Sequence, residues 1–454
     1  MKPSRYNRIF QAQDGTWLAF NTWSSALAAI EPENLPFIRA LLAEPHAVPC
    51  DSPDKREIRE MLFRGHFLIE DEEDELATLK VDILKDRFRT DLMALTIAPT
   101  LDCNFRCDYC YEDHLRVTMS STVQQALLQW VEAHAGTIAR LQVCWFGGEP
   151  TLPSAFPVVE GLSRSFLELA RARGIEYSAE IVTNGYFIDR SRVDLLKSLG
   201  VQKIQITLDG PPVIHDRRRI LLGGQGTFWR ILDNLKAIAG MIPIQLRINV
   251  DRRNAAATID LIELLDREGI AEKVHPYIAQ VTAGGSACGN IVESCFDGPD
   301  FANMAADLYR EAAKRGLPLS RFPFRIRGAF CTAERSNAFV IAPSGAIFKC
   351  WEEVTSNPGA AINHLLDGQQ AFHRANESRW LSWNVFEKEE CPSCDVLPAC
   401  HGGCPLSAMS RPQSPRGACE EFKFNLQPLL EIRHLFRPAQ PDEPPPRGGF
   451  GASC

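Results

Sequence analysis

Apolar and polar positions follow two alternating patterns between residue 94 and about residue 283. Short apolar runs recur there, and each of the first five precedes a stretch in which apolar residues return every three or four positions. The short runs are typical of buried parallel strands, and the longer stretches are typical of amphipathic helices. Strands are therefore expected at residues 94–98, 141–145, 178–183, 203–208, 244–250 and 274–279. Repeated units of this kind predict an α/β fold with helices outside a parallel sheet.

The chain before this region predicts a small N-terminal α+β module. Residues 8–10 and 16–20 flank the turn Asp14-Gly15, which is the pattern of a β-hairpin. The rest of the module is expected to contain two helices, a returning strand and a solvated acidic loop or helix start, at residues 35–42, 55–64, 65–69 and 70–75.

Changes in pattern divide the chain into five expected parts. They are an N-terminal module (1–90), a strand–helix core (91–283), a bridge (284–325), a cysteine-rich domain (326–425) and a disordered tail (426–454). The tail from Arg437 onward is rich in Pro and Gly and cannot bury a core, so we expect it to be disordered.

Charge and cysteine content narrow the class of function. The chain has 49 basic and 57 acidic residues and a net charge of -8, which argues against nucleic acid as a principal partner. It lacks a run of 18 or more apolar residues and an apolar signal-peptide core at its start, so we expect a cytoplasmic protein without a membrane partner. Fifteen cysteines in a reducing compartment indicate metal binding more than disulfides.

Three of these cysteines follow the first predicted strand of the core. Cys103, Cys107 and Cys110 are separated by three and then two residues, and their thiolates can converge on one soft metal centre. A tetrahedral zinc site would need a fourth ligand nearby, whereas an iron-sulfur cubane held by three cysteines keeps one iron open. The strand's C-terminal end is where barrel enzymes place their sites.

This spacing, with Tyr109 directly before the third cysteine, resembles the radical S-adenosylmethionine (SAM) enzymes. The resemblance implies a 4Fe-4S cluster whose open iron binds SAM and supplies the electron that cleaves it to a 5'-deoxyadenosyl radical. It also implies that the six strand–helix units form a partial (β/α)6 barrel, open on one side to a large substrate.

Motifs at later strand ends strengthen the resemblance. They are Gly147-Gly148-Glu149-Pro150, Thr183-Asn184-Gly185 and Asp209-Gly-Pro, and Arg247 lies in an otherwise largely apolar strand. Two glycines let a backbone approach a ligand closely, and a buried arginine needs an anionic partner, either SAM or an ordinary carboxylate. By resemblance, the expected SAM contacts are Tyr109, Gly147, Gly148, Glu149, Asn184, Asp209 and Arg247. No catalytic acid or base is assigned.

A second cysteine array lies beyond Arg325. Its seven cysteines match the SPASM extension of radical SAM proteins in order and in every short spacing: Cys331, Cys350, Cys391, Cys394, Cys400, Cys404 and Cys419. The resemblance implies two auxiliary 4Fe-4S clusters, one bound by Cys331, Cys350 and Cys404 and the other by Cys391, Cys394, Cys400 and Cys419. The first set is one ligand short. Either Cys288 or Cys295 completes it, or one iron stays open to bind substrate. A zinc ribbon at Cys391, Cys394, Cys400 and Cys404 is the alternative.

The resemblance implies an oxidoreductase that acts on a peptide or protein. The preferred function is maturation of a ribosomally synthesised precursor peptide by an oxidative cross-link, thioether or carbon–carbon, with a flavodoxin-type reductase as electron donor. The N-terminal module loosely resembles leader-peptide recognition domains, and a lid or packing extension is the alternative. One alternative is a sulfatase-maturing enzyme, although Trp351 stands where those relatives carry a catalytic Asp after the cysteine. A non-catalytic iron-sulfur electron carrier is another.

Overall fold

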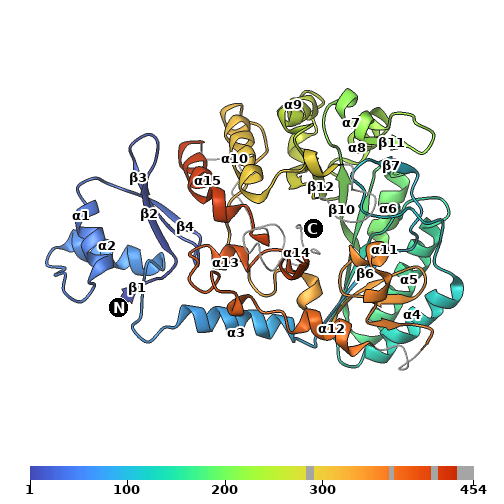
Figure 1. Ribbon diagram of the computed structural model, residues 1–454, viewed down its shortest axis with the longest axis horizontal. Helices are drawn as coiled ribbons and strands as arrows, with labels where there is room; N and C mark the ends of the chain where they lie inside the picture. The colour runs from blue at the N-terminus through green and yellow to red at the C-terminus, as the bar shows by residue number, and fades with distance from the viewer. Residues whose placement is uncertain (283–290, 368–372, 411–417, 437–454) are drawn as a thin grey trace.

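The computed structural model describes residues 1–282, 291–367, 373–410 and 418–436. Its main feature is a nine-stranded sheet in the order β13-β12-β10-β9-β8-β6-β14-β15-β16 (Figure 1). The six predicted strands are confirmed to within two residues and run parallel, each beside the next in the chain. They are β6 (Leu92–Ile97), β8 (Arg140–Trp145), β9 (Glu176–Thr183), β10 (Val201–Thr207), β12 (Ile244–Val250) and β13 (His275–Gln280).

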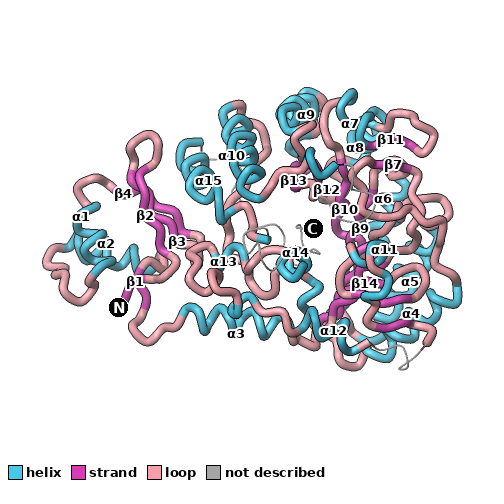
Figure 2. Tube along the Cα trace, in the orientation of Figure 1, coloured by secondary structure: helices cyan, strands magenta, loops and turns pink. Residues whose placement is uncertain are grey.

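Helices pack on the outer face of these strands (Figure 2). All except α7 bury apolar residues against the strands; in α4, for example, Val123, Leu127 and Val131 face them. Ser120 caps α4 by accepting a hydrogen bond from the Val123 backbone N–H. The helices are α4 (Ser121–His134), α5 (Phe156–Arg173), α6 (Arg190–Ser198), α7 (Pro212–Arg218), α8 (Phe228–Ile238) and α9 (Thr258–Arg267). The predicted α/β class and partial barrel are thereby confirmed.

The cysteine-rich region continues the same sheet. Strand β14 (Ala338–Ile341) pairs in parallel with β6, from Ala338 opposite Ala94 to Ile341 opposite Ile97. Strands β15 (Ala346–Phe348) and β16 (Asn363–His364) then add antiparallel pairs. Strand β14 was not predicted, so the structure joins two parts of the chain that we expected to be separate.

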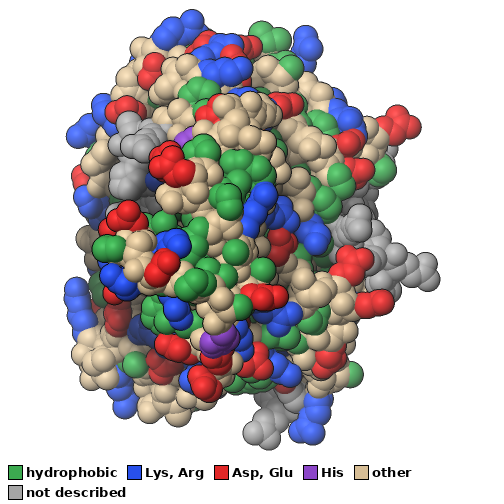
Figure 3. Space-filling view, turned by 90° about the vertical axis from the view of Figure 1, so that its left-hand side faces the viewer, with side chains coloured by type: hydrophobic (Ala, Val, Ile, Leu, Met, Phe, Trp, Pro, Cys, Tyr) green, Lys and Arg blue, Asp and Glu red, His purple; other side chains and the backbone are tan. Residues whose placement is uncertain are grey.

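The N-terminal module contains the predicted hairpin. Strand β2 (Asn7–Gln11) pairs with β3 (Trp17–Asn21) across Gly15, whose φ of 89° suits glycine. A third strand, β4 (Ala26–Ile30), was not predicted. The other elements of the module follow the expected order: α1 (Leu35–Ala43), α2 (Pro53–Arg64), and β5 (Leu68–Ile69), which pairs with β1 (Lys2–Pro3). Figure 3 faces this module and shows acidic, basic and hydrophobic side chains interspersed.

This module packs against the cysteine-rich region. Tyr6 and Trp23 belong to a buried cluster with Trp383 and Val385. Arg8 of β2 forms an ion pair with Asp395, with Nη2 and Oδ2 2.6 Å apart. Helix α3 (Glu75–Arg87), which begins at the end of the predicted acidic segment, spans the base of the molecule between the two regions (Figure 1).

The C-terminal part is mostly short helices. They are α10 (Gly298–Lys314) in the expected bridge, α11 (Glu353–Ser356), α12 (Arg374–Leu381), α13 (Leu397–Cys400), α14 (Pro405–Ser410) and α15 (Phe422–Phe436). The predicted start of the disordered tail at residue 426 is wrong, because Leu426, Leu429 and Leu430 of α15 are buried, and this helix packs on α10. Residues 437–454 and Cys288 lie outside the described residues. Within the described part of the chain, every helix is too short or too polar to cross a membrane.

Candidate functional site

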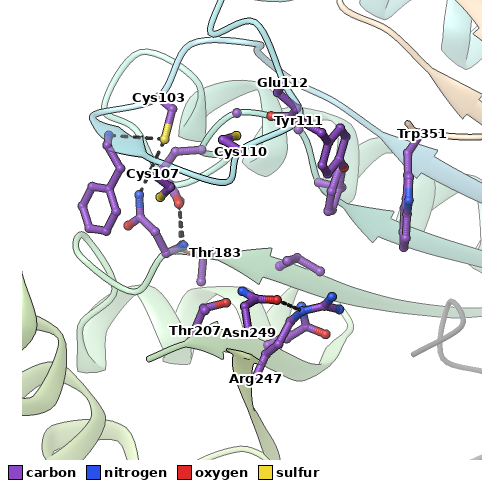
Figure 4. A pocket seen from close by; sticks show the side chains of 18 of the residues that line it. Cys103, Cys107, Cys110, Tyr111, Glu112, Thr183, Thr207, Arg247, Asn249 and Trp351 are labelled. Carbon is purple, nitrogen blue, oxygen red and sulfur yellow. Dashed lines mark hydrogen bonds between the residues drawn. The ribbon is translucent and has the colours of Figure 1, made fainter. Parts of the chain in front are cut away.

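The first cysteine loop lies at the C-terminal end of β6. Cys103 precedes the short strand β7 (Phe105–Cys107), which pairs with β11 (Arg219–Leu221) and so fixes the position of Cys107. The Cys110 backbone N–H donates to the Cys107 carbonyl at 3.2 Å and closes the loop. The structure brings the three cysteines together at one end of a cavity (Figure 4).

These three thiols fit a cluster better than a single ion. Across the described ranges, no three His, Cys, Asp or Glu side chains lie close enough to share one metal ion. A four-iron cubane binds each cysteine at a different iron, so three thiols around one cavity are a suitable donor set. Burial raises the pKa of all three thiols. The charge of Glu149 raises the pKa of Cys103 further, the charge of Glu112 does the same for Cys110, and neighbouring thiolates add to both. A bound metal would reverse this by stabilising the thiolates.

The Gly147-Gly148-Glu149 turn packs against the cysteine loop. A Cβ on Gly148 would lie 2.1 Å from the Asp102 carbonyl oxygen, and the Glu149 backbone N–H donates to that oxygen at 2.8 Å. Gly147 has a φ of 92°, and a Cβ there would lie 2.6 Å from the Cβ of Ala98. The glycines therefore allow two protein segments to approach closely, and both glycines also line the cavity.

The Glu149 carboxylate is buried and held by protein donors. Oε1 accepts hydrogen bonds from the backbone N–H and hydroxyl of Thr151 and from the Thr183 hydroxyl, and Oε2 accepts the Asn184 backbone N–H at 2.6 Å. Burial raises the pKa of Glu149 despite these bonds. The carboxylate thus connects the ends of β8 and β9 beside the cysteines, and both Glu149 and Asn184 line the cavity.

Asn184 also contacts the cysteine loop directly. Its Nδ2 donates to Asn104 Oδ1 at 2.8 Å and lies 3.9 Å from Cys103 Sγ. Gly185 follows with a φ of 81°, and a Cβ there would lie 2.8 Å from Ile206. The Thr-Asn-Gly motif therefore positions the loop as well as lining the cavity.

Asp209 is differently placed from what we expected. It is 1% exposed and outside the cavity lining, and its Oδ2 accepts the Tyr109 hydroxyl at 2.5 Å while Oδ1 accepts the Asn249 backbone N–H at 2.9 Å. The Tyr109 hydroxyl in turn accepts from Arg219 at 2.6 Å. The expected SAM contact at Asp209 is thus replaced by a structural one, because its carboxylate satisfies the buried tyrosine. Tyr109 itself lines the cavity.

The inner face of the strands gives the cavity a polar lining. Arg247 of β12 lines it, and its Nε donates to Asn249 Oδ1 at 2.8 Å (Figure 4). Deeper in the barrel, Lys203 of β10 pairs with Glu180 of β9, with 2.6 Å between Nζ and Oε2. Gln205 accepts the Tyr277 hydroxyl at 2.8 Å. The sequence analysis missed the Lys203–Glu180 pair, although both are charged residues within largely apolar strands.

Trp351 faces the cysteine loop from the far side of the cavity (Figure 4). Its ring stacks on that of Phe146, the residue before Gly147, with centroids 4.7 Å apart. Glu352 also lines this wall. This contact therefore connects the Gly-Gly-Glu turn to the cysteine-rich region, because Trp351 directly follows Cys350.

The C-terminal cysteines gather into two groups. Burial raises the pKa of Cys350, and the charges of Cys331 and Cys404 raise it further. In the other group, burial and the charges of Cys419 and Cys394 raise the pKa of Cys391 to about 11. A hydrogen bond with Cys419 and then burial raise the pKa of Cys400. Among the described cysteines, Cys295 does not pack with either group; it packs against Val281 and Ile291, as Tyr109 and Tyr111 do.

Comparison with known families identifies the class. Residues 97–265 match the radical SAM superfamily, and this segment includes the cysteine loop and the Gly-Gly-Glu, Thr-Asn-Gly and Arg247 positions. The segment that carries three cysteines at the end of the first barrel strand is thus a radical SAM domain.

Individual relatives include a sulfatase-maturating enzyme. The chain is 23% identical over 360 residues to the cysteine-type anaerobic sulfatase-maturating enzyme of Clostridium novyi. The alignment covers 73% of this chain and 93% of the relative. The chain is 30% identical over 141 residues to an uncharacterized protein of Synechocystis, and there the chain spans only 34% of the relative's length.

Two solved structures share the fold. Native anSMEcpe with bound AdoMet and the Cp18Cys peptide gives a TM-score of 0.56 at 19% identity, covering 76% of this chain and 96% of that chain. Streptococcus suis SuiB bound to the precursor peptide SuiA gives 0.52 at 15% identity, covering 91% of this chain and 98% of that chain. At these identities the likeness shows the fold alone.

Proposed function

We propose that this protein is a radical SAM peptide maturase that installs an oxidative cross-link, thioether or carbon–carbon, in a ribosomally synthesised precursor peptide. The observation that carries the proposal is the cavity itself. The cysteine loop lies at one end of it, and Trp351, which directly follows Cys350, forms the opposite wall. A substrate there would lie between the two cysteine regions.

The chain's residues divide the chemistry between the two ends of the cavity. Cys103, Cys107 and Cys110 would hold a 4Fe-4S cluster, which when bound supplies the electron that cleaves SAM to a hydrogen-abstracting radical. Glu149 and Asn184 brace the loop that carries these cysteines and line the adjoining space, and Arg247 offers a cation to an anionic group such as a carboxylate.

The C-terminal cysteine groups support a net oxidation. Forming a cross-link from a substrate carbon radical requires the loss of one electron and one proton. Auxiliary 4Fe-4S clusters at Cys331, Cys350 and Cys404, and at Cys391, Cys394, Cys400 and Cys419, would accept such electrons. The burial of these thiols in two groups is compatible with such clusters.

The N-terminal module would recognise part of the precursor. Its three-stranded sheet has β2 and β4 as edges, and an edge strand offers unpaired backbone groups to an extended peptide. The match to SuiB, whose solved complex contains a precursor peptide, extends over more of this chain than the match to anSMEcpe does. A cytoplasmic location and a flavodoxin-type electron donor belong to the same proposal.

The deciding experiment combines the reconstituted protein with SAM, dithionite and the short peptide encoded beside its gene. We expect 5'-deoxyadenosine together with a peptide that has lost two hydrogens. Absence of 5'-deoxyadenosine, with or without peptide, would instead favour an electron carrier.

A sulfatase-maturing activity is the second candidate, favoured by the similarity to the Clostridium novyi enzyme over most of its length. It is opposed by Trp351, which provides no carboxylate where a base is expected. Formylglycine in a Cys- or Ser-containing sulfatase peptide would establish this activity.

A further inference from the structure

Lys423 makes a direct contact with one of the C-terminal cysteines. Its Nζ lies 3.2 Å from Cys394 Sγ, within hydrogen-bonding distance of a sulfur acceptor. The side chain is half-buried in the first turn of α15, four residues after Cys419, and its backbone N–H donates to the Glu420 carbonyl at 3.0 Å. The start of the helix therefore holds the ammonium group at this thiol.

A cation at this position does not stabilise the helix. The N-terminal end of a helix carries a partial positive charge and favours acidic residues, yet the first turn of α15 has none. A lysine there is electrostatically unfavourable unless a nearby anion compensates. A Cys394 thiolate would be that anion, and the charge of Cys419 also acts on Lys423.

Asp395 is the competing anion, and the N-terminal module neutralises it. Its charge acts on Lys423, but Arg8 binds its Oδ2 through Nε at 2.9 Å and Nη2 at 2.6 Å. Arg5 donates to the Pro392 carbonyl at 2.6 Å and holds the same loop. With Asp395 paired to Arg8, the ammonium group of Lys423 remains directed at Cys394.

We propose that Lys423 is a positioning residue that raises the reduction potential of the iron-sulfur cluster held by Cys391, Cys394, Cys400 and Cys419. This inference rests on the proposed function, because it requires a cluster at that group. Reduction adds one negative charge, part of which falls on the thiolates, so a hydrogen-bonded cation stabilises the reduced state more than the oxidised state.

The consequence concerns the last step of the cross-link. When the substrate carbon radical bonds to a second substrate atom, that atom's bond to hydrogen breaks. One electron would then pass to the oxidised cluster, and the proton would pass to solvent. A higher potential makes this cluster a better acceptor for that electron. Lys423 would therefore favour completed product over return of the hydrogen atom to the substrate radical.

The test is a potentiometric titration of the reconstituted full-length holoenzyme, followed by electron paramagnetic resonance, with iron counted in each sample. In Lys423→Met we expect one midpoint to fall so that the ratio of oxidised to reduced cluster rises about tenfold at fixed potential, which is about 59 mV for one electron. Lys423→Arg should keep the wild-type midpoint.

Lys388→Met is the matched control. Its charge also acts on Cys391, but within the described residues it makes no hydrogen bond to a cysteine sulfur. We expect a smaller shift there than in Lys423→Met. Equal shifts in the two variants would overturn the assigned role of the Lys423–Cys394 contact.

Lys423→Gln covers the case in which Lys423→Met fails to load its cluster, because glutamine keeps an N–H donor without the charge. An unchanged midpoint in loaded Lys423→Met or loaded Lys423→Gln would overturn the inference and leave the maturase function intact. A wild-type protein without iron at this group would overturn both the inference and the auxiliary-cluster part of the proposed function.

Discussion

Trp351 stacks on Phe146 with ring centroids 4.7 Å and planes 17° apart, and the pair connects the cysteine-rich region to the Gly-Gly-Glu turn. Both rings line the cavity, and Trp351 directly follows Cys350. The stacked pair therefore places a residue of the C-terminal region, Trp351, on the cavity wall beside the turn.

Replacing Trp351 by Ala should separate SAM cleavage from product formation. We expect 5'-deoxyadenosine to form at close to the wild-type rate, while kcat/KM for the cross-linked peptide falls about tenfold or more, because an aromatic pair and its buried area are lost. Trp351→Phe, which keeps a ring to stack on Phe146, should retain most activity. An equal loss of both products in Trp351→Ala would mean that the ring supports the SAM site instead.

Cysteine substitutions in the two regions should affect different products. Cys103→Ala, Cys107→Ala or Cys110→Ala should abolish 5'-deoxyadenosine formation, whereas Cys391→Ala should retain it and lose the cross-link. Chromatography of 5'-deoxyadenosine and mass spectrometry of the peptide measure the two outcomes. Cys50→Ala, at a half-buried site in the N-terminal module, is the control and should change neither. Intact cross-linking by Cys391→Ala would refute the role assigned to the second array.

Gly148 should tolerate no side chain. A Cβ there would lie 2.1 Å from the Asp102 carbonyl oxygen, and backbone cannot rotate away as a side chain can. We expect Gly148→Ala to lower the free energy of unfolding by about 1–3 kcal/mol, as overpacking does, and to displace the cysteine loop, which iron content would report.

Gly161→Ala is the control for that experiment. Gly161 lies in α5, where a Cβ meets no atom within 4 Å. Alanine there should raise stability by about 0.5–1 kcal/mol, because it favours the helix more than glycine does. Denaturant unfolding of the two variants gives the comparison, and equal stabilities would contradict the close approach of the turn to the loop.

His215 should make stability depend on pH. It is fully buried between the Asp209 backbone N–H and the Thr227 hydroxyl, and burial lowers the pKa of its imidazole well below 6.5. The unfolded chain takes up a proton below about pH 6.5 while the folded chain does not. Stability is therefore fully present above that pH and is lost as the pH falls, by up to about 1.4 kcal/mol per pH unit.

Thermal unfolding between pH 5 and 7.5 tests this, with His215→Gln as the variant. Glutamine does not titrate, so its unfolding midpoint should depend less on pH than that of the wild type. His46→Gln, at a position where the ring is 69% exposed, should leave the wild-type dependence unchanged. Identical pH dependence in all three proteins would contradict the neutral buried imidazole.

The sequence predicted those features that local pattern determines. Strand positions followed from apolar runs, and the cysteine spacing pointed to the family before any contact was known. Strand β14 was missed because its four residues acquire their place only by pairing with β6, more than two hundred residues earlier in the chain.

Side-chain direction was the other limit. An Asp-Gly-Pro sequence indicates a turn, but it does not say that the Asp209 carboxylate will face Tyr109 and away from the cavity. Lys203 and Glu180 are brought together by the parallel register of β10 with β9, which places them directly opposite each other. Such pairs depend on tertiary structure. A local pattern can mark a charged residue within a strand, but it does not identify the partner of that residue.

The pairing of β14 with β6 has a consequence for biosynthesis. Until residues 338–341 have been translated, the backbone of Ala94–Ile97 presents an open edge beside the cysteine loop. An exposed edge strand is a template for aggregation. A barrel expressed without residues 338–341 should therefore yield more insoluble material than the full chain.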